Sequence, residues 1–151
     1  MLIETKTLGK VEIEEKNVLN FPEGLFGFEE FHKYALINAE YEPFYYLQSL
    51  DTKDLAFLLV DPFLIAPEYE LDIDDSILEE IGIKTVSDVL LYAIVTIPVN
   101  GSPVTANLQG PVIINRKNNK ALQAVLTNTQ WTTKHDIVKA LQKTVAAGEG
   151  K

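Results

Sequence analysis

The two histidines are the side chains best suited to acid–base chemistry near neutral pH, because the unperturbed pKa of imidazole lies closest to it. His32 follows an aromatic segment, His135 precedes the C-terminal segment, and neither belongs to a recognisable catalytic motif. No serine is flanked by the glycines of a nucleophile elbow. The sequence therefore predicts no pairing of a nucleophile with a base.

Clustered carboxylates raise the questions of metal binding and of acid catalysis. An EF-hand loop that began at Asp72 would need a glycine at its sixth position and a glutamate at its twelfth, where the chain has Ile77 and Ile83. Asp51 and Asp54 are typical of a turn between two strands. We therefore expect no metal site, no cofactor and no enzymatic activity.

A glycine-rich phosphate loop is the third possibility, and Gly24-x-x-Gly27 comes closest to it. It lacks the lysine and the preceding long strand of a P-loop, and Leu25 and Phe26 between the glycines are expected to be buried. Proline fixes φ and glycine allows positive φ, so residues 21–31 are better explained as a tight aromatic turn. We call residues 21–31 the corner.

Charge is distributed unevenly along the chain. The formal net charge is −9, and residues 61–83 carry eight acids and no base. A surface of that sign repels phosphate backbones and attracts basic proteins, so we expect no direct nucleic-acid binding, while binding to a basic protein stays open. The alternative is that the carboxylates only keep the protein soluble. Seven of them form what we call the acidic belt: Glu68, Glu70, Asp72, Asp74, Asp75, Glu79 and Glu80.

Length and composition predict a single soluble domain. The chain has 151 residues, 46% of them hydrophobic, and no cysteine. That is enough to bury one core without disulfides or thiolate metal sites. No apolar run approaches the roughly 20 residues that span a bilayer, and the N-terminus lacks a signal-peptide pattern. We expect a cytoplasmic domain over residues 1–147 and a flexible tail over residues 148–151.

Alternating and β-branched segments predict many short strands. These strands span residues 2–5, 11–14, 18–21, 34–38, 44–50, 55–60, 89–98, 104–108, 112–115 and 122–127. A short helix starts at Asp74 or Asp75 and ends at Gly82, residues 28–33 form one helical turn, and an amphipathic helix covers residues 135–147. The pattern predicts a mainly β fold, an antiparallel pseudo-barrel or sandwich with a short middle helix and a C-terminal helix.

Several blocks, taken in order, carry a resemblance to a known family. They are Phe21-Pro22-Glu23-Gly24-Leu25 with Gly27-Phe28-Glu29, Leu47-Gln48-Ser49-Leu50, Leu55-Ala56-Phe57 with Val60-Asp61-Pro62-Phe63, and Thr105-Ala106-Asn107-Leu108 with Pro111-Val112-Ile113-Ile114-Asn115. Up to about Trp131 the chain resembles the FliW family of flagellar assembly factors. The resemblance implies a non-catalytic, mostly β pseudo-barrel in which Phe21, Pro22, Gly24, Gly27, Phe28, Asp61, Pro62 and Asn107 serve as structural motif residues.

The resemblance also implies a partner switch. FliW-like proteins bind the basic RNA-binding translational repressor CsrA and block its repression of flagellin translation. They bind newly made flagellin as the competing partner. When unsecreted flagellin accumulates, it takes up the FliW-like protein, and the released repressor stops flagellin translation. The partners so implied are a CsrA-type protein and flagellin. Apart from the resemblance, we expect no membrane contact and a monomeric free state.

The acidic belt offers a physical basis for repressor binding. Docked beside a cationic RNA-binding face, it would steer association and place negative charge where RNA phosphates lie. Exposed ion pairs contribute only about 0 to 1 kcal/mol each, so apolar anchors are also needed. Leu64, Ile65 and Val104 are the candidates, whereas Phe63 is expected in the core. Strand alternation turns Tyr45 away from its neighbours and makes it a candidate exposed aromatic for flagellin.

Two other functions stay open at this stage. A small-molecule-binding β-barrel would have a roomy pocket lined by converging polar groups. A secretion chaperone dedicated to flagellin would bind flagellin and ignore CsrA. The C-terminal end also departs from the family pattern, because members commonly finish soon after the last strand, whereas residues 135–147 here have a helical pattern.

Overall fold

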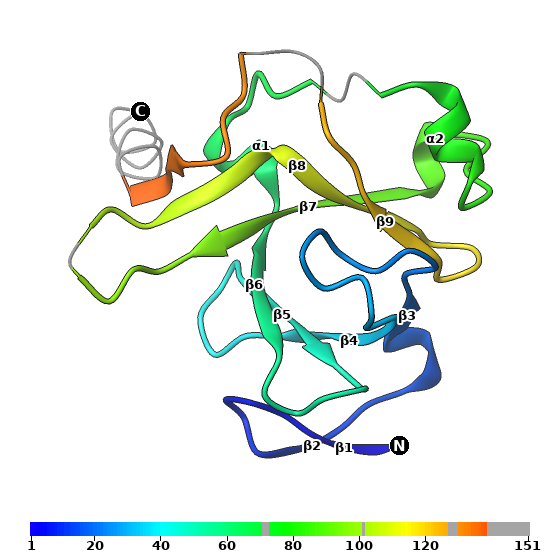
Figure 1. The fold of residues 1–151 in the computed structure, drawn as a ribbon, viewed down its shortest axis with the longest axis vertical. Coiled ribbons are helices and arrows are strands. Elements are labelled where there is room, and N and C mark those ends of the chain that lie inside the picture. The colour runs from blue at the N-terminus through cyan, green and yellow to red at the C-terminus, as the bar shows by residue number, and fades with distance from the viewer. Residues whose placement is uncertain (71–72, 101, 127–129, 139–151) are drawn as a thin grey trace, which may run out of the picture.

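The computed structural model describes residues 1–70, 73–100, 102–126 and 130–138. A small antiparallel sheet pairs β1 (Leu2–Glu4) with β2 (Lys10–Glu12). The other strands form one antiparallel sheet in the order β10-β8-β7-β6-β5-β4-β3, with β9 also paired to β8 (Figure 1). Its strands are β3 (Val18–Asn20), β4 (Lys33–Asn38), β5 (Tyr45–Ser49), β6 (Ala56–Val60), β7 (Val89–Thr96), β8 (Thr105–Asn115), β9 (Ala121–Gln123) and β10 (His135–Asp136).

The large sheet curls until its two ends nearly meet. Asn20, the last residue of β3, forms a parallel bridge with Lys120 just before β9, and its backbone N–H donates to the carbonyl of Asn119 over 2.9 Å. The register of β7 against β8 shifts between Tyr92 and Ile94, and such a bulge lets a long strand pair bend. The predicted mainly β, pseudo-barrel fold is confirmed.

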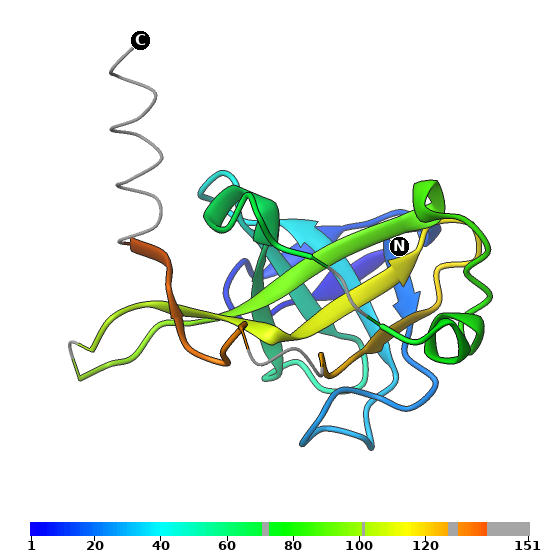
Figure 2. The same cartoon turned by 90° about the horizontal axis from the view of Figure 1, so that it is seen from above.

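The long strands β7 and β8 are largely buried, and their uncharged sequence is compatible with packing on both faces. Residues 89–115 contain no acidic or basic side chain. Val112 and Ile114 point into the interior with Phe21 and Leu47, while Ile113 points outward under the segment that holds α2 (Asp75–Glu79). At its far end the β7–β8 hairpin extends beyond the body of the sheet (Figure 2).

The helical elements are short. The complete ones within the described ranges are, besides α2, the helix α1 (Pro62–Ile65) and two 3₁₀ turns, η1 (Glu15–Asn17) and η2 (Val86–Asp88). The predicted middle helix is confirmed, and Gly82 follows it with φ +75°. Sequence reasoning missed α1, which Asp61 caps by accepting a hydrogen bond from the Phe63 backbone N–H over 2.9 Å.

Three other expectations about elements were wrong. Residues 104–108 and 112–115 belong to one continuous strand, β8. Residues 28–33 form no helical turn, because Phe28 pairs with Leu25 in an isolated bridge and Lys33 already starts β4. His135 does not open a helix but pairs with Ala106 in β10. The remainder of the predicted C-terminal helix from residue 139, and the tail at 148–151, lie outside the described residues.

Candidate functional site

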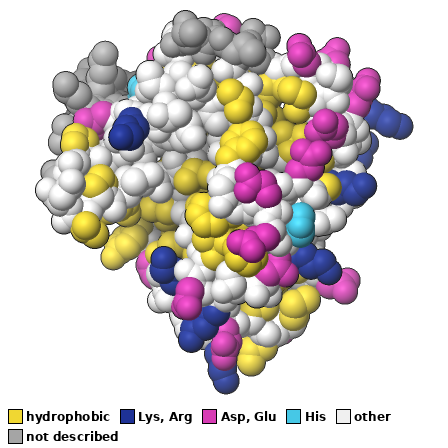
Figure 3. All heavy atoms as spheres, in the orientation of Figure 1, with side chains coloured by type: hydrophobic (Ala, Val, Ile, Leu, Met, Phe, Trp, Pro, Cys, Tyr) yellow, Lys and Arg dark blue, Asp and Glu magenta, His cyan; other side chains and the backbone are white. Residues whose placement is uncertain are grey.

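The acidic belt runs from the end of α1 to the end of α2. Glu68 and Glu70 flank the buried Tyr69, so their carboxylates face solvent while the ring anchors the segment. Asp74, Asp75, Glu79 and Glu80 stand at the two ends of α2 and are all exposed. Figure 3 shows acidic side chains gathered over this part of the molecule, at its upper right. Asp72 lies outside the described residues.

The six described carboxylates of the belt have no ion-pair partner among the described residues. Within the described part of the chain, none of the six forms a salt bridge; the ion pairs there join Met1 to Glu12, Lys16 to Glu14 and Lys117 to Asp88. The belt therefore presents its negative charge to solvent and to any partner that approaches.

Two asparagines fasten the end of the belt to the β8–β9 hairpin. The side-chain amides of Asn115 and Asn118 both donate to the carbonyl of Ile81 over 2.9 Å. Gly82 faces the same amides, and a Cβ there would lie 3.3 Å from Asn118 Nδ2. Asn115 is buried, and its Oδ1 also accepts from the Lys117 backbone N–H. Because these bonds hold its C-terminal end, α2 keeps a fixed position on the barrel.

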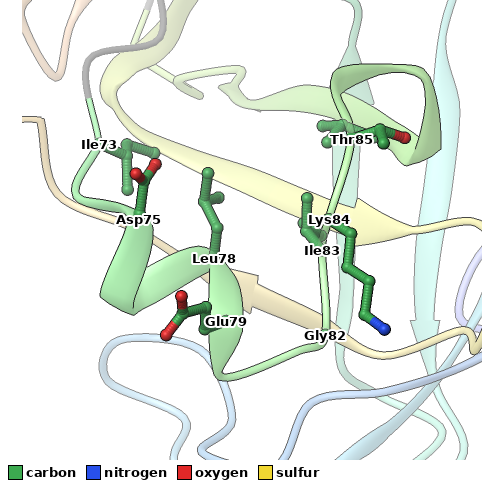
Figure 4. A pocket seen from close by; sticks show the side chains of 9 residues that line it. Ile73, Asp75, Leu78, Glu79, Gly82, Ile83, Lys84 and Thr85 are labelled. Atoms are coloured by element: carbon green, nitrogen blue, oxygen red, sulfur yellow. The ribbon is translucent and has the colours of Figure 1, made fainter.

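A hollow of about 820 Å³ lies beside α2. Its apolar lining comes mainly from Ile73, Leu78 and Ile83 (Figure 4). The carboxylates of Asp75 and Glu79 and the ammonium of Lys84 point in different directions instead of meeting at one place. Converging polar groups are what orient a small ligand, so this hollow does not favour the small-molecule alternative.

The apolar side chains considered as anchors beside the belt differ from the prediction in which of them are exposed and which are buried. Phe63 and Leu64 are 45% and 42% exposed, whereas Ile65 is buried in the core. The expectations for Phe63 and Ile65 were therefore wrong. The reason is α1: its helical period puts Pro62 and Ile65 on the inner side and the two residues between them outside. Val104 is half-buried against the core.

Tyr45 is not the exposed aromatic that strand alternation predicted. Its ring packs edge-on against Tyr92, with the centroids 5.3 Å apart, and it belongs to the partly buried rim of the inner core. Tyr46 does face the opposite side of the sheet, but there it packs with Ile3 and Ile37 beneath the β1–β2 sheet. Both faces of β5 are covered, so alternation alone could not leave one tyrosine in solvent.

The corner is buried at its base and exposed at its tip. Phe21 and Leu25 lie in the core, and the ring of Phe21 meets the edge of Tyr34. Phe26, which was expected to be buried, is 54% exposed, and Phe28 is 36% exposed. No sequence signal distinguishes Phe26 from its buried neighbours, because the turn geometry decides which side chain points outward.

The remaining motif positions have local structural roles. Asp61 and Pro62 start α1 as its cap and first residue. Asn107 Oδ1 accepts hydrogen bonds from the backbone N–H groups of Gln109 and Gly110 over 3.1 and 2.8 Å. A Cβ on Gly110 would lie 2.9 Å from the Asn107 amide, so the two residues fit only as a pair.

Other kinds of site find no support among the described residues. These residues hold no group of three His, Cys, Asp or Glu side chains arranged to bind a metal ion. A search of the same residues finds no helix with the length and hydropathy needed to cross a membrane. The exposed belt and the apolar side chains beside it are thus the candidate site, and they suit binding to another macromolecule.

Comparison with known proteins agrees with this fold. A family model described as FliW protein matches residues 2–137. A flagellar assembly factor FliW of Treponema denticola is 55% identical over 141 residues, which cover 93% of this chain and 96% of that protein. A second, of Treponema pallidum, is 51% identical over 138 residues, with coverages of 91% and 92%. A crystal structure of the flagellar assembly factor FliW matches with a TM-score of 0.83 and 42% identity, covering 91% of this chain and 96% of that one. Because the family model, the relatives and the fold agree, this chain belongs to the FliW family of flagellar assembly factors.

Proposed function

We propose that this chain is a non-enzymatic regulator of flagellar assembly that acts in the cytoplasm through two protein partners. It binds a basic RNA-binding repressor of the CsrA type and blocks repression of flagellin translation, and it binds flagellin as the competing partner. Family membership supports the flagellar role. The observation that carries repressor binding is the acidic belt, whose described carboxylates are exposed and form no salt bridge with described residues.

The belt favours a cationic partner for two physical reasons. Its uncompensated charge raises the rate of encounter with a basic protein. It also repels RNA phosphates, but only within about one Debye length, roughly 8 Å at physiological salt. The belt must therefore lie at the interface or beside it. Fastened by Asn115 and Asn118, α2 holds its carboxylates in place before the partner arrives.

Apolar contacts beside the belt complete the proposal. Leu64 and Val104 stay candidate anchors, and the exposed Phe63 joins them. Ile65 is withdrawn because it is buried, and Tyr45 is withdrawn as a flagellin contact because its ring packs against Tyr92. Flagellin then competes either by covering the same surface or by coupling from another one, for which about 1 to 3 kcal/mol would suffice.

A gel shift tests the central claim. Flagellin leader RNA bound to the CsrA-type protein of the same organism is titrated with this protein at physiological salt. We expect release of the RNA at stoichiometric protein and its rebinding when flagellin is added. If the RNA stays bound at stoichiometric protein, repressor antagonism is excluded.

Charge reversal tests the role of the belt. Asp74→Lys with Asp75→Lys should weaken the complex with the repressor, because both exposed side chains lie in the belt. The matched control, Glu4→Lys with Glu15→Lys, changes the net charge equally on β1 and η1 and should leave affinity nearly unchanged. If calorimetry shows equal losses of affinity for the two pairs, the belt acts only through the net charge of the protein.

The flagellin-only chaperone is the alternative with the most direct test. A pull-down with both purified partners separates the two functions: capture of flagellin without the repressor would replace the switch by a chaperone role. The small-molecule alternative is disfavoured, because the polar groups around the hollow beside α2 do not converge.

A further inference from the structure

The corner exposes one aromatic side chain to solvent although neighbouring side chains on the same turn are buried. Phe26 is 54% exposed, although Phe21 and Leu25 on the same turn are fully buried. Phe28 is 36% exposed and rests edge-on against Phe57, with the ring centroids 5.2 Å apart. The tip of the corner therefore offers two partly exposed rings on one short turn.

The turn that carries Phe26 is held in a single shape. The Phe26 backbone N–H donates to Gln123 Oε1 over 3.0 Å, and Gln123 Nε2 donates in turn to the carbonyl of Gly110. Gly24 has φ +70°, and a Cβ there would lie 2.6 Å from the Glu29 backbone. A side chain presented by a rigid turn loses little conformational freedom on binding, which is how aromatic anchors of interfaces gain their effect.

The corner and the acidic belt form one continuous surface. A cleft of about 270 Å³ lies between them, lined by Pro22 and Glu23 of the corner, Glu80 and Ile81 after α2, and Ala121 and Leu122 of β9. In the middle of the face in Figure 3, apolar side chains are bordered by acidic ones where the corner lies in front of the sheet. A partner that covers the belt can reach the tip of the corner as well.

The charge around the corner selects the kind of partner. Its three ionisable residues, Glu23, Glu29 and Glu30, are exposed glutamates, and Glu80 lies across the cleft. Two lysines lie close to this region in the sequence: Lys33 follows the corner after His32, and Lys120 directly precedes β9. A second copy of this acidic chain would meet like charge here, whereas a cationic protein would meet opposite charge.

We propose that Phe26 is a further apolar anchor of the interface with a cationic protein partner, entering an apolar recess that Lys or Arg side chains surround. The inference rests on the proposed function, because the repressor supplies the cationic surface. The corner then takes part in binding in addition to its structural role.

Kinetics of binding to the CsrA-type protein test this assignment. Phe26→Ser should weaken affinity tenfold or more, mainly through faster dissociation, because apolar anchors act on the lifetime of a complex. Phe26→Leu should retain most of the affinity. The melting temperature should stay unchanged in both variants, since the side chain is exposed.

Tyr41→Ser is the matched control. Tyr41 is 72% exposed and follows β4, whereas the corner precedes it. Six strand residues at about 3.3 Å each separate the two sites by about 20 Å, so this variant should bind like the wild type.

Each other outcome overturns the assignment. If the wild type binds and Phe26→Ser binds equally, the corner has no part in binding and the proposed function stands. If the wild type does not bind the repressor at all, both proposals fall together. If the wild type sediments as a dimer and Phe26→Ser as a monomer, the corner joins two copies of this chain instead.

Discussion

Two glycines of the corner show how the backbone conformation restricts which residue can occupy a position. Gly24 and Gly27 both have positive φ, +70° and +87°, but their surroundings differ. A Cβ on Gly24 would meet the Glu29 backbone, whereas a Cβ on Gly27 would meet nothing within 4 Å. The first glycine is thus required by both conformation and space, and the second by conformation alone.

Alanine substitutions at Gly24 and Gly27 should separate the cost of the left-handed conformation from the cost of the steric clash. Gly27→Ala should lower the free energy of unfolding by about 1 to 2 kcal/mol, the cost of a left-handed conformation. Gly24→Ala should cost clearly more, because the turn must also open. Urea unfolding of both variants measures the difference, and equal losses would mean that the turn widens freely.

Asp51, in the turn between β5 and β6, forms hydrogen bonds with the residues that follow the corner. Its protonation should therefore change the free energy of unfolding. Its Oδ2 accepts hydrogen bonds from the backbone N–H groups of His32 and Lys33, which lower the pKa of the carboxyl from its ordinary value. A depressed folded-state pKa adds stability above the unfolded-state pKa, and this stability is lost as the pH falls through the folded-state value.

Asp51→Asn should therefore destabilise the protein near neutral pH by less than about 1 kcal/mol, because the site is exposed. The difference from the wild type should shrink as the pH falls below about 4, near the ordinary pKa of aspartate. Thermal unfolding across this range measures it. A difference that is constant with pH would show that the charge has no part.

Among the elements, α2 depends most clearly on contacts from elsewhere. It has five residues, far fewer than an isolated helix needs. Ile81 and Ile83 pack with Ile113 of β8, and the Asn115 and Asn118 amides bind the carbonyl of Ile81. The belt therefore takes its position from the β8–β9 hairpin.

Removing the two amides tests this dependence. Asn115→Ala should lower the free energy of unfolding by about 2 kcal/mol, since it removes a buried side chain and the acceptor of the Lys117 backbone N–H. Asn118→Ala should cost less, because Asn115 still satisfies Ile81. The double variant should lose more than the sum, since Ile81 O then has neither amide. Simple additivity in denaturant unfolding would argue against a shared role.

Sequence patterns predicted the elements better than the surfaces. Alternation located most strands, and the Asp74 and Gly82 signals located α2, because both depend on local conformation. α1 escaped because Asp61-Pro62 also fits a strand end, and four residues are too few for a helical period. The exposure of Phe26 depends on the shape of the turn, and the partial burial of Tyr45 depends on its packing against Tyr92 of β7. Periodicity encodes neither.

At the scale of the whole molecule, charge and apolar sequence occupy different regions. Residues 61–83 carry eight acids and no base, and residues 89–115 are uncharged. The acidic stretch lies over a barrel whose longest strands carry no charge to offset it. Its field should therefore act on a partner before contact.

Salt should reveal this field in the association rate. The rate constant for binding the CsrA-type protein should fall tenfold or more between low and high ionic strength. The Asp74→Lys, Asp75→Lys variant should show a flatter dependence, and Phe26→Ser should keep the wild-type slope. Stopped-flow measurements give all three, and a flat wild-type slope would exclude steering.

The contacts that close the barrel, between β3 and the corner on one side and the region around β9 on the other, have a consequence for synthesis on the ribosome. Asn20 joins residues 119 and 120, and Phe26 joins Gln123, across about a hundred residues of chain. Closing so long a loop has a large entropic cost, and distant contacts form slowly. Until residue 123 emerges, β3 and the corner have no partner there, so the nascent chain holds an open sheet edge that is prone to pair with other strands. The barrel, and with it the joined surface of corner and belt, is completed only after residue 123 has left the ribosome.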